Sequence, residues 1–209
     1  RAAKTMGEAG KAYVRGRYDN NMRYLDDQIQ RIFDHLDENA TVMIVSDHGE
    51  EFWEHGGFEH GHTLHDELLR VPLILKGPDV EPGRFDAPTS LLDVAPTLAA
   101  MHGVDTVGMV GSDLRLLANG QRTEQFESRP QAFGRPLYGL RQWGSLQKNL
   151  KYTVSQGQEA IYDMDQDAGE QRSQIAKIDP TPLRQALGFA LERPFVQAFR
   201  IVLNRTKSG

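Results

Sequence analysis

The sequence predicts an α/β fold in its first part and a small antiparallel sheet with a long terminal helix in its second. Three observations support this prediction. An apolar stripe with helical spacing runs through residues 1–36. Two short apolar runs, Val42–Val45 and Val71–Leu75, have the length and composition of strands. After Gln121, short β-prone runs alternate with glycine and asparagine, a pattern typical of antiparallel strands.

The first predicted element is a helix within residues 1–36. Apolar side chains recur there every three or four positions, which places them on one face of a helix. They are Val14, Tyr18, Met22, Leu25, Ile29, Ile32 and Leu36. We expect a scaffold helix that packs on a sheet.

Two predicted strands follow. Val42–Val45 is apolar and mostly β-branched, which favours a buried strand of a parallel sheet. Ligands of open α/β sheets bind at the carboxyl ends of strands, and Asp47 and His48 stand at such an end. We expect Gly49 to allow a sharp turn there. Pro72 lies near the start of the second run, which indicates a strand start or an edge.

The sequence of residues 90–104 predicts a helix. We expect Asp93 and Thr97 to have capping and packing roles in it.

The later β-prone runs are Gln131–Arg135, Leu137–Trp143, Leu150–Ser155 and Ala160–Met164. A division between residues 1–122 and 123–209 follows from this change of pattern.

The last predicted element is a helix within residues 180–205, with Pro182 in its first turn. Its apolar stripe consists of Leu183, Leu187, Leu191, Phe195, Phe199 and Val202. Pro194 is expected to kink or divide it. We expect the stripe to pack on the small sheet; because the helix is rich in basic residues, contact with a membrane surface stays open.

Composition limits the possible functions. The 209 residues carry a net charge of −5, which argues against general nucleic-acid binding. There is no cysteine, so disulfides and thiol chemistry are excluded. No apolar run approaches the roughly 20 residues of a membrane-spanning helix. The sequence opens without methionine in a charged, helix-like stretch, from which we expect it to be part of a longer protein.

The segment between Ile32 and Leu69 has an unusual charge pattern. It contains ten acidic residues and six histidines but no lysine or arginine. Carboxylates and imidazoles without accompanying cations are suited to binding an added divalent cation. A solvated histidine-rich loop is the alternative interpretation.

Residues 46–75, SDHGEEFWEHGGFEHGHTLHDELLRVPLIL, closely resemble the second metal-ligand segment of the sulfatases, members of the alkaline-phosphatase superfamily. Weaker resemblances follow in the family's order. These are Ser90–Val104, Met109–Gly120, Lys151-Tyr152, Ile161–Met164 and Asp167–Glu170. The last departs from the family's D-P-x-E pattern at a turn. The resemblance implies an alkaline-phosphatase-like mixed sheet flanked by helices, of which this chain holds the C-terminal half.

The resemblance implies one divalent metal ion, with Asp47 and His48 among its ligands. Calcium is the ion expected from the family, and a histidine ligand also suits manganese, magnesium or zinc. Sulfatases often have a lysine on the following loop to contact the substrate. This chain has none there, so we expect His60 to take that role as a catalytic and substrate-binding group, with His62 as the second choice.

Other residues of the segment receive supporting roles. His55 is expected to bind substrate or to order the loop. Arg70 is expected to brace the second strand by pairing with Glu67 or Asp66. Three glutamates are expected to be solvated or to cap the loop, with metal binding as the alternative: Glu50, Glu51 and Glu54.

The family's nucleophile is absent from this sequence. It lies in a C-x-P-x-R or S-x-P-x-R segment, and the nearest approach, Ser128–Ala132, lacks the arginine. The family's N-terminal pair of aspartates is missing too. We therefore expect half a metal site, no turnover by this chain alone, and a missing N-terminal half as its partner.

The implied activity is hydrolysis of sulfate esters of small molecules or glycans. Because Asp-His also occurs in other branches of the superfamily, a phosphoryl-ester hydrolase or a phosphoethanolamine- or glycerophosphate-type transferase stays an alternative. A non-catalytic sulfatase-like binding module is another. Localisation is left open, and the resemblance favours a periplasmic or other extracytoplasmic site.

Overall fold

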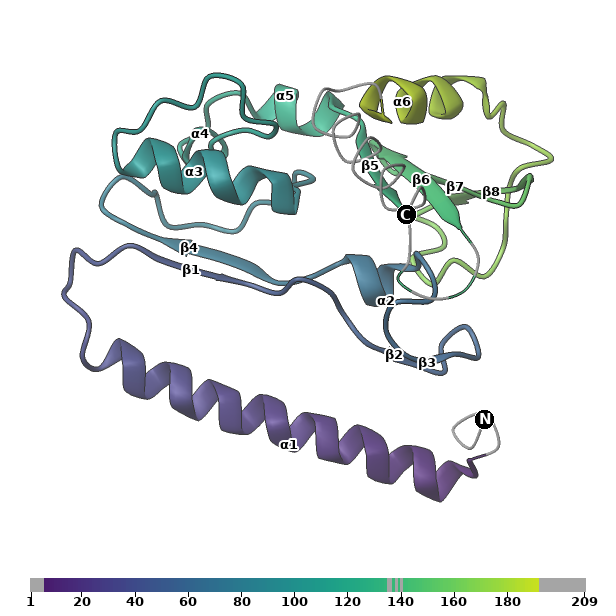
Figure 1. Cartoon of the computed structure of the whole chain (residues 1–209), viewed down its shortest axis with the longest axis horizontal. Coiled ribbons are helices and arrows are strands. Elements are labelled where there is room, and N and C mark those ends of the chain that lie inside the picture. Colours follow the sequence, from purple (N-terminus) through teal and green to yellow (C-terminus); the bar gives the residue numbers. More distant parts are fainter. Residues whose placement is uncertain (1–5, 135–136, 138, 140, 192–209) are drawn as a thin grey trace, which may run out of the picture. The chain divides into compact units, whose positions relative to one another are not determined.

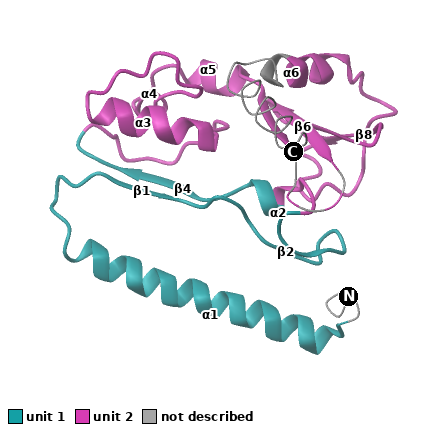
Figure 2. Ribbon diagram, viewed as in Figure 1, with its two compact units in different colours: residues 1–61, 67–78 teal, residues 62–66, 79–209 magenta. Residues whose placement is uncertain are grey.

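The structure is a computed structural model that describes residues 6–134, 137, 139 and 141–191. The chain forms two compact units (Figure 2). The first contains residues 1–61 and 67–78, and the second contains residues 62–66 and 79–209. The segment 62–66 therefore belongs to a different unit from the residues on either side of it. The predicted division at residues 122 and 123 stays a prediction.

The first unit begins with α1 (Glu8–Phe33), drawn in purple in Figure 1, which confirms the predicted helix. The expected burial of its stripe is wrong within the described residues, where α1 has no buried residue. Met22, Leu25 and Ile32 are exposed. The unit's sheets have only two strands each, so they offer little surface for a 26-residue helix to cover.

Strand β1 (Val42–Val45) pairs antiparallel with β4 (Leu73–Lys76), and Val45 lies opposite Leu73. The predicted strands are confirmed, but the prediction of a buried strand in a parallel sheet is wrong for this pair. All four β1 residues are only half-buried. Parallel pairing needs a crossover, usually a long helix, whereas the intervening chain holds only two-residue strands and a four-residue helix.

Gly49 follows β1 and lies directly against the backbone of α2 (Asp66–Leu69). Its N–H donates to the carbonyl of Leu68 at 2.9 Å. A Cβ at this position would stand 1.9 Å from the carbonyl oxygen of Glu67. The expected reason for glycine was a sharp turn, but its φ lies outside the left-handed region. Glycine is needed here because two backbones approach closely.

The second unit contains a group of short helices built around the buried carboxylate of Asp93. These are the 3₁₀ helix η2 (Leu91–Asp93), α3 (Val94–Met101), α4 (Arg115–Ala118) and α5 (Thr123–Ser128). Asp93 accepts the N–H groups of Ser90 and Ser112 at 2.8 Å each and pairs with Arg129. Thr97 accepts the N–H of Leu114 at 2.9 Å. The predicted capping and packing roles of Asp93 and Thr97 are confirmed.

The same unit contains the predicted small antiparallel sheet, drawn in green in Figure 1. Its strands, in hydrogen-bonded order, are β5 (Gln131–Gly134), β6 (Gln142–Gln147), β7 (Leu150–Ser155) and β8 (Gln158–Asp163). Helix α6 (Thr181–Leu191) packs on it through Leu183 and Leu187, which join Tyr152 and Ile161 in a core.

Some predictions fall outside the described residues. They concern the continuation of the last helix through Pro194, Phe195, Phe199 and Val202, and with it the question of membrane contact. Among the helices that the structure describes, none has the length and apolar character needed to cross a membrane.

A surface cluster ties α6 to the sheet. Glu159 on β8 accepts hydrogen bonds from Arg184 and from the hydroxyl of Tyr152. The hydrogen bond from Arg184, followed by that from Tyr152, lowers the pKa of Glu159 from 4.5 to about 2. Burial, followed by the hydrogen bond to Glu159, raises the pKa of the Tyr152 phenol. The carboxylate is therefore stabilised in the folded state.

Replacing Gly49 by alanine should destabilise the chain, because the new methyl group collides with the Glu67 carbonyl. Overpacking of this kind costs about 1–3 kcal/mol. Chemical denaturation measures the change. Gly16→Ala, in open space on α1, is the matched control and should stabilise by about 0.5–1 kcal/mol. Equal effects of the two substitutions would contradict the assignment.

Glu159→Gln should lower the free energy of unfolding at pH 7, and its effect should vanish in acid. The folded-state pKa is depressed, so the stabilisation is complete above the unfolded value of 4.5 and is lost as the pH falls toward about 2. Denaturation of both proteins between pH 7 and pH 2 tests this. Glu124→Gln, on exposed α5 surface, should leave the pH profile unchanged. A difference that persists undiminished in acid contradicts the prediction.

Candidate active site

The carboxyl end of β1 presents a carboxylate to solvent. Asp47 accepts the N–H of His48 at 3.0 Å, and the hydroxyl of Ser46 donates to the His48 carbonyl at 2.7 Å, so the chain forms a tight turn. The Asp47 side chain is 87% exposed. Its remaining lone pairs are therefore open to a ligand from outside.

The ring of His48 has a defined tautomer. Its Nδ1 lies 2.8 Å from the carbonyl oxygen of Gly49. A carbonyl oxygen only accepts, so Nδ1 carries the hydrogen and the neutral ring keeps its lone pair on Nε2. Nε2 lies 3.8 Å from an oxygen of Asp47. Histidines that bind metals usually hold their second nitrogen in this way.

His60 lies against His48. The two rings stack with centroids 3.9 Å apart and an interplanar angle of 24°. The Nδ1 of His60 faces a carboxylate oxygen of Glu50 at 3.2 Å, which orients the ring. The structure thus brings together three of the five predicted site residues: Asp47, His48 and His60.

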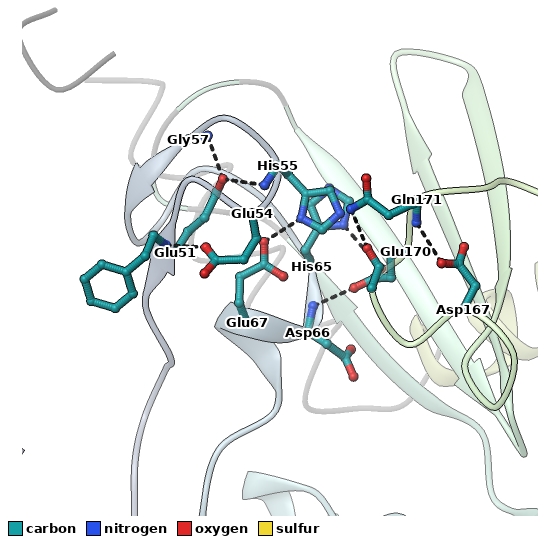
Figure 3. A network of polar contacts seen from close by, with 12 residues as sticks. Glu51, Glu54, His55, Gly57, His65, Asp66, Glu67, Asp167, Glu170 and Gln171 are labelled. Carbon is teal, nitrogen blue, oxygen red and sulfur yellow. Dashed lines mark hydrogen bonds and ion pairs between the residues drawn. The ribbon is translucent and has the colours of Figure 1, made fainter. Parts of the chain in front are cut away.

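Glu51 holds the hairpin that carries His55, and it is fully buried. It begins β2 (Glu51–Phe52), which pairs with β3 (Phe58–Glu59). One oxygen accepts the N–H groups of His55 at 3.1 Å and of Gly57 at 2.6 Å (Figure 3). The solvated interpretation is therefore wrong for Glu51, and the loop-capping interpretation is confirmed.

Alternation along the chain explains why Glu50 and Glu51 differ. Adjacent residues of an extended segment point to opposite faces, so one glutamate meets His60 and the other is buried. This was the signal in the sequence that could have separated them. Glu54 is at the surface, where it pairs with Arg15 at 3.4 Å.

His55 pairs with Glu67 in a largely enclosed setting. Its Nδ1 lies 2.6 Å from a Glu67 oxygen, and the two side chains are 15% and 16% exposed (Figure 3). A loop-ordering role would use this contact, and substrate binding by His55 stays a prediction. Because Glu67 binds His55 and Asp66 binds Lys151, the predicted pairing of Arg70 is wrong. In the part of the chain that the structure describes, Arg70 is exposed and has no ion pair.

His62 and His65 belong to the second unit. The carbonyl of His62 accepts a long hydrogen bond, 3.5 Å, from the side chain of Gln142. The Nδ1 of His65 lies 3.3 Å from a Glu170 oxygen. The roles predicted for His62 stay predictions.

The donors at the end of β1 fit part of a divalent-metal site. Asp47 offers an exposed carboxylate and His48 a lone pair on Nε2, both of them suitable ligands. Across the described residues no group of three or more histidine, aspartate or glutamate side chains is arranged to hold a metal ion. The observed pair therefore accounts for two ligands, and a full coordination sphere needs more donors.

Comparisons with known proteins show which proteins this chain is similar to. A family model described as Sulfatase matches residues 2–104. Over 137 residues the chain is 32% identical to the choline-sulfatase of Rhizobium meliloti (strain 1021), which covers 60% of this chain and 27% of that protein.

Two solved structures share the fold. A crystal structure of a sulfatase-like protein from Bacteroides thetaiotaomicron VPI-5482 superposes with a TM-score of 0.77 and 20% identity over 94% of this chain and 45% of that one. A protein in complex with its substrate D-glucosamine-2-N,6-O-disulfate superposes with a TM-score of 0.67 and 22% identity over 84% and 38%. These likenesses confirm the predicted alkaline-phosphatase-like α/β fold.

The chain spans less than half of each of these proteins. Within that span, the family model covers the segment that bears Asp47, His48 and His60. Residues 2–104 of this chain match the sulfatase family, and its curated relatives are similar to it over parts of their length.

Proposed function

We propose that this chain is part of an enzyme that hydrolyses sulfate esters, and that Asp47 and His48 supply one side of its divalent-metal site. The observation that carries the proposal is the ring of His48. Its Nδ1 donates a hydrogen bond to the Gly49 carbonyl. Nε2 therefore keeps a lone pair that can bind a metal ion, and it lies beside the exposed carboxylate of Asp47. A solvated loop does not require this arrangement.

A bound divalent ion supplies polarisation of the ester oxygen and keeps a nucleophile anionic. Asp47 would balance part of its positive charge. The Ser46 hydroxyl and the Gly49 carbonyl hold His48 in place. Calcium is the expected ion. The imidazole donor also suits manganese, magnesium or zinc.

His60 is the proposed contact for the sulfate group or the leaving oxygen. Its ring rests on His48 and its Nδ1 is held by Glu50, so Nε2 is the nitrogen left to meet a substrate oxygen. A protonated imidazole can donate a proton to a departing alkoxide. His62 is the second candidate, and His55 would order the loop through Glu67 or reach the substrate itself.

A sulfate ester of a small molecule or a glycan is the proposed substrate. Choline-sulfatase and the protein bound to a disulfated glucosamine both act on such groups by name, which favours sulfate over phosphoryl chemistry. The tautomer and surroundings of His48 favour a metal-binding role over the alternative of a non-catalytic binding module.

The nucleophile is proposed to lie in an N-terminal half that this sequence does not contain. There is no cysteine. Ser128 ends α5, and Arg129 is engaged by the buried Asp93, so the S-R-P run serves the helical group instead. Exposed apolar residues of α1 would suit contact with that other half.

Manganese should bind weakly at the end of β1, with a Kd of about 10⁻³ M, because only two ligands are present. Paramagnetic broadening of amide and imidazole NMR signals locates the ion. Signals of Asp47, His48 and His60 should broaden first. Asp47→Asn should weaken the binding by about tenfold or more.

Asp86→Asn is the matched control, since that carboxylate is 88% exposed and Asp47 is 87% exposed. It should leave the broadening unchanged. Broadening that persists in Asp47→Asn, or that centres on other acidic residues, counts against the proposed site.

The 209-residue chain alone should not hydrolyse 4-nitrophenyl sulfate, with or without calcium or manganese, because it lacks a nucleophile. Release of nitrophenolate measures this. Turnover that disappears in Asp47→Ala would overturn the prediction, since it would show a complete catalytic site in this chain.

A further inference from the structure

A buried group of charges holds the segment 62–66 in the second unit. Lys151, the second residue of β7, is 1% exposed, and its Nζ lies 2.8 Å from Asp66 and 2.9 Å from Glu170. The ammonium group also lies 5.6 Å from the centroid of the Phe133 ring. Asp66 is the last residue of the segment, so Lys151 contacts it directly.

Glu170 binds the same segment at two further points. Its Oε2 accepts the backbone N–H of Asp66 at 2.6 Å, and its Oε1 lies 3.3 Å from the Nδ1 of His65 (Figure 3). Burial raises the pKa of Glu170, but hydrogen bonds from His65, Lys151 and the Asp66 amide outweigh it, and the net pKa is lowered. The carboxylate is thus kept charged where it meets the segment.

The backbone of Glu170 is strained. Its φ is +51°, in the left-handed region that favours glycine. The glycine is one position earlier, at Gly169, so a glutamate adopts this conformation. Strain of this kind persists when surrounding contacts over-determine a position, and it is common at functional sites. Its contacts to Asp66, His65 and Lys151 supply that constraint.

Burying the charges of Lys151 and Glu170 is a poor means of gaining stability. The desolvation cost offsets much of the attraction, and apolar replacements of such groups are often neutral or better. Fixing one geometry is the better-supported use of a buried ionic group. The geometry fixed here is that of a segment whose first residue is His62.

We propose that Lys151 and Glu170 are positioning residues. They hold the main chain of residues 62–66 and thereby determine the position of the His62 side chain. The proposal rests on the role proposed above for the histidine segment. Leu64, 5% exposed, adds an apolar anchor between His62 and the charged group. The C-terminal sheet, on which no predicted catalytic residue lies, would then control the placement of a substrate-facing histidine.

Amide hydrogen exchange of the full 209-residue chain, read by NMR, tests the proposal. Lys151→Met leaves the buried carboxylate of Glu170 and the partly exposed one of Asp66 without their cation. Glu170→Gln removes the charged acceptor of the Asp66 amide. In both variants exchange at Asp66 should accelerate by about tenfold or more. The amide of Tyr152 on β7 should keep its rate, since the sheet core is unchanged.

Glu159→Gln is the matched control, because it removes a different glutamate ion pair of the same sheet. It should leave Asp66 unaffected. Equal acceleration at Asp66 and Tyr152 would show a purely structural role, and unchanged exchange at Asp66 would show no anchoring; either overturns the proposal. If Lys151→Met does not fold, Glu170→Gln decides alone.

The imidazole signals supply a second readout. In Glu170→Gln the ring signals of His62 and His65 should shift, while that of His102, beyond α3, should stay in place. An unshifted His62 signal overturns the positioning role. Because these measurements need neither metal nor turnover, they separate failure of this proposal from failure of the proposed sulfatase activity.

Discussion

The arrangement of the candidate metal ligands depends on one backbone contact, the approach of Gly49 to α2. The Gly49 N–H reaches the Leu68 carbonyl, and the space beside Glu67 admits no side chain. The same residue offers its own carbonyl to the ring of His48. One glycine thus joins the end of β1 to a helix nearly twenty residues later in the chain. Its carbonyl also determines that Nε2 is the nitrogen of His48 that keeps a lone pair for a metal ion. Loss of that contact would release the turn and the tautomer together.

The elements of the fold could largely be predicted, and their pairings could not. The stripe from Val14 to Leu36 identified α1, and glycine and asparagine separated the strands of the small sheet. Strand β1 was recognised from its β-branched residues. Its antiparallel neighbour and its half-burial depend on β4, which is distant in sequence. Periodicity reports on local geometry, whereas the direction of pairing is a property of the connection between strands.

For the candidate site, sequence order was informative only near the strand. The apolar run before Asp47 and His48 predicts their position at the end of β1, and the resemblance to the family predicts the role of His60. The sequence does not predict the partners that hold these residues. Glu67 pairs with His55, not Arg70, and Lys151 and Glu170 meet Asp66 from about a hundred residues away. Such partners leave no local signal, because only the folded chain brings them together.

The stack of His48 on His60 has a consequence for how this segment can diverge. A ring at one position forms the support for the ring at the other. Replacement of His48 by asparagine, which has no ring, would remove that support and change which side chains position 60 can accommodate. The effect of a substitution at position 48 therefore depends on the residue at position 60, and the reverse also holds. Relatives of this chain should be compared at the two positions together.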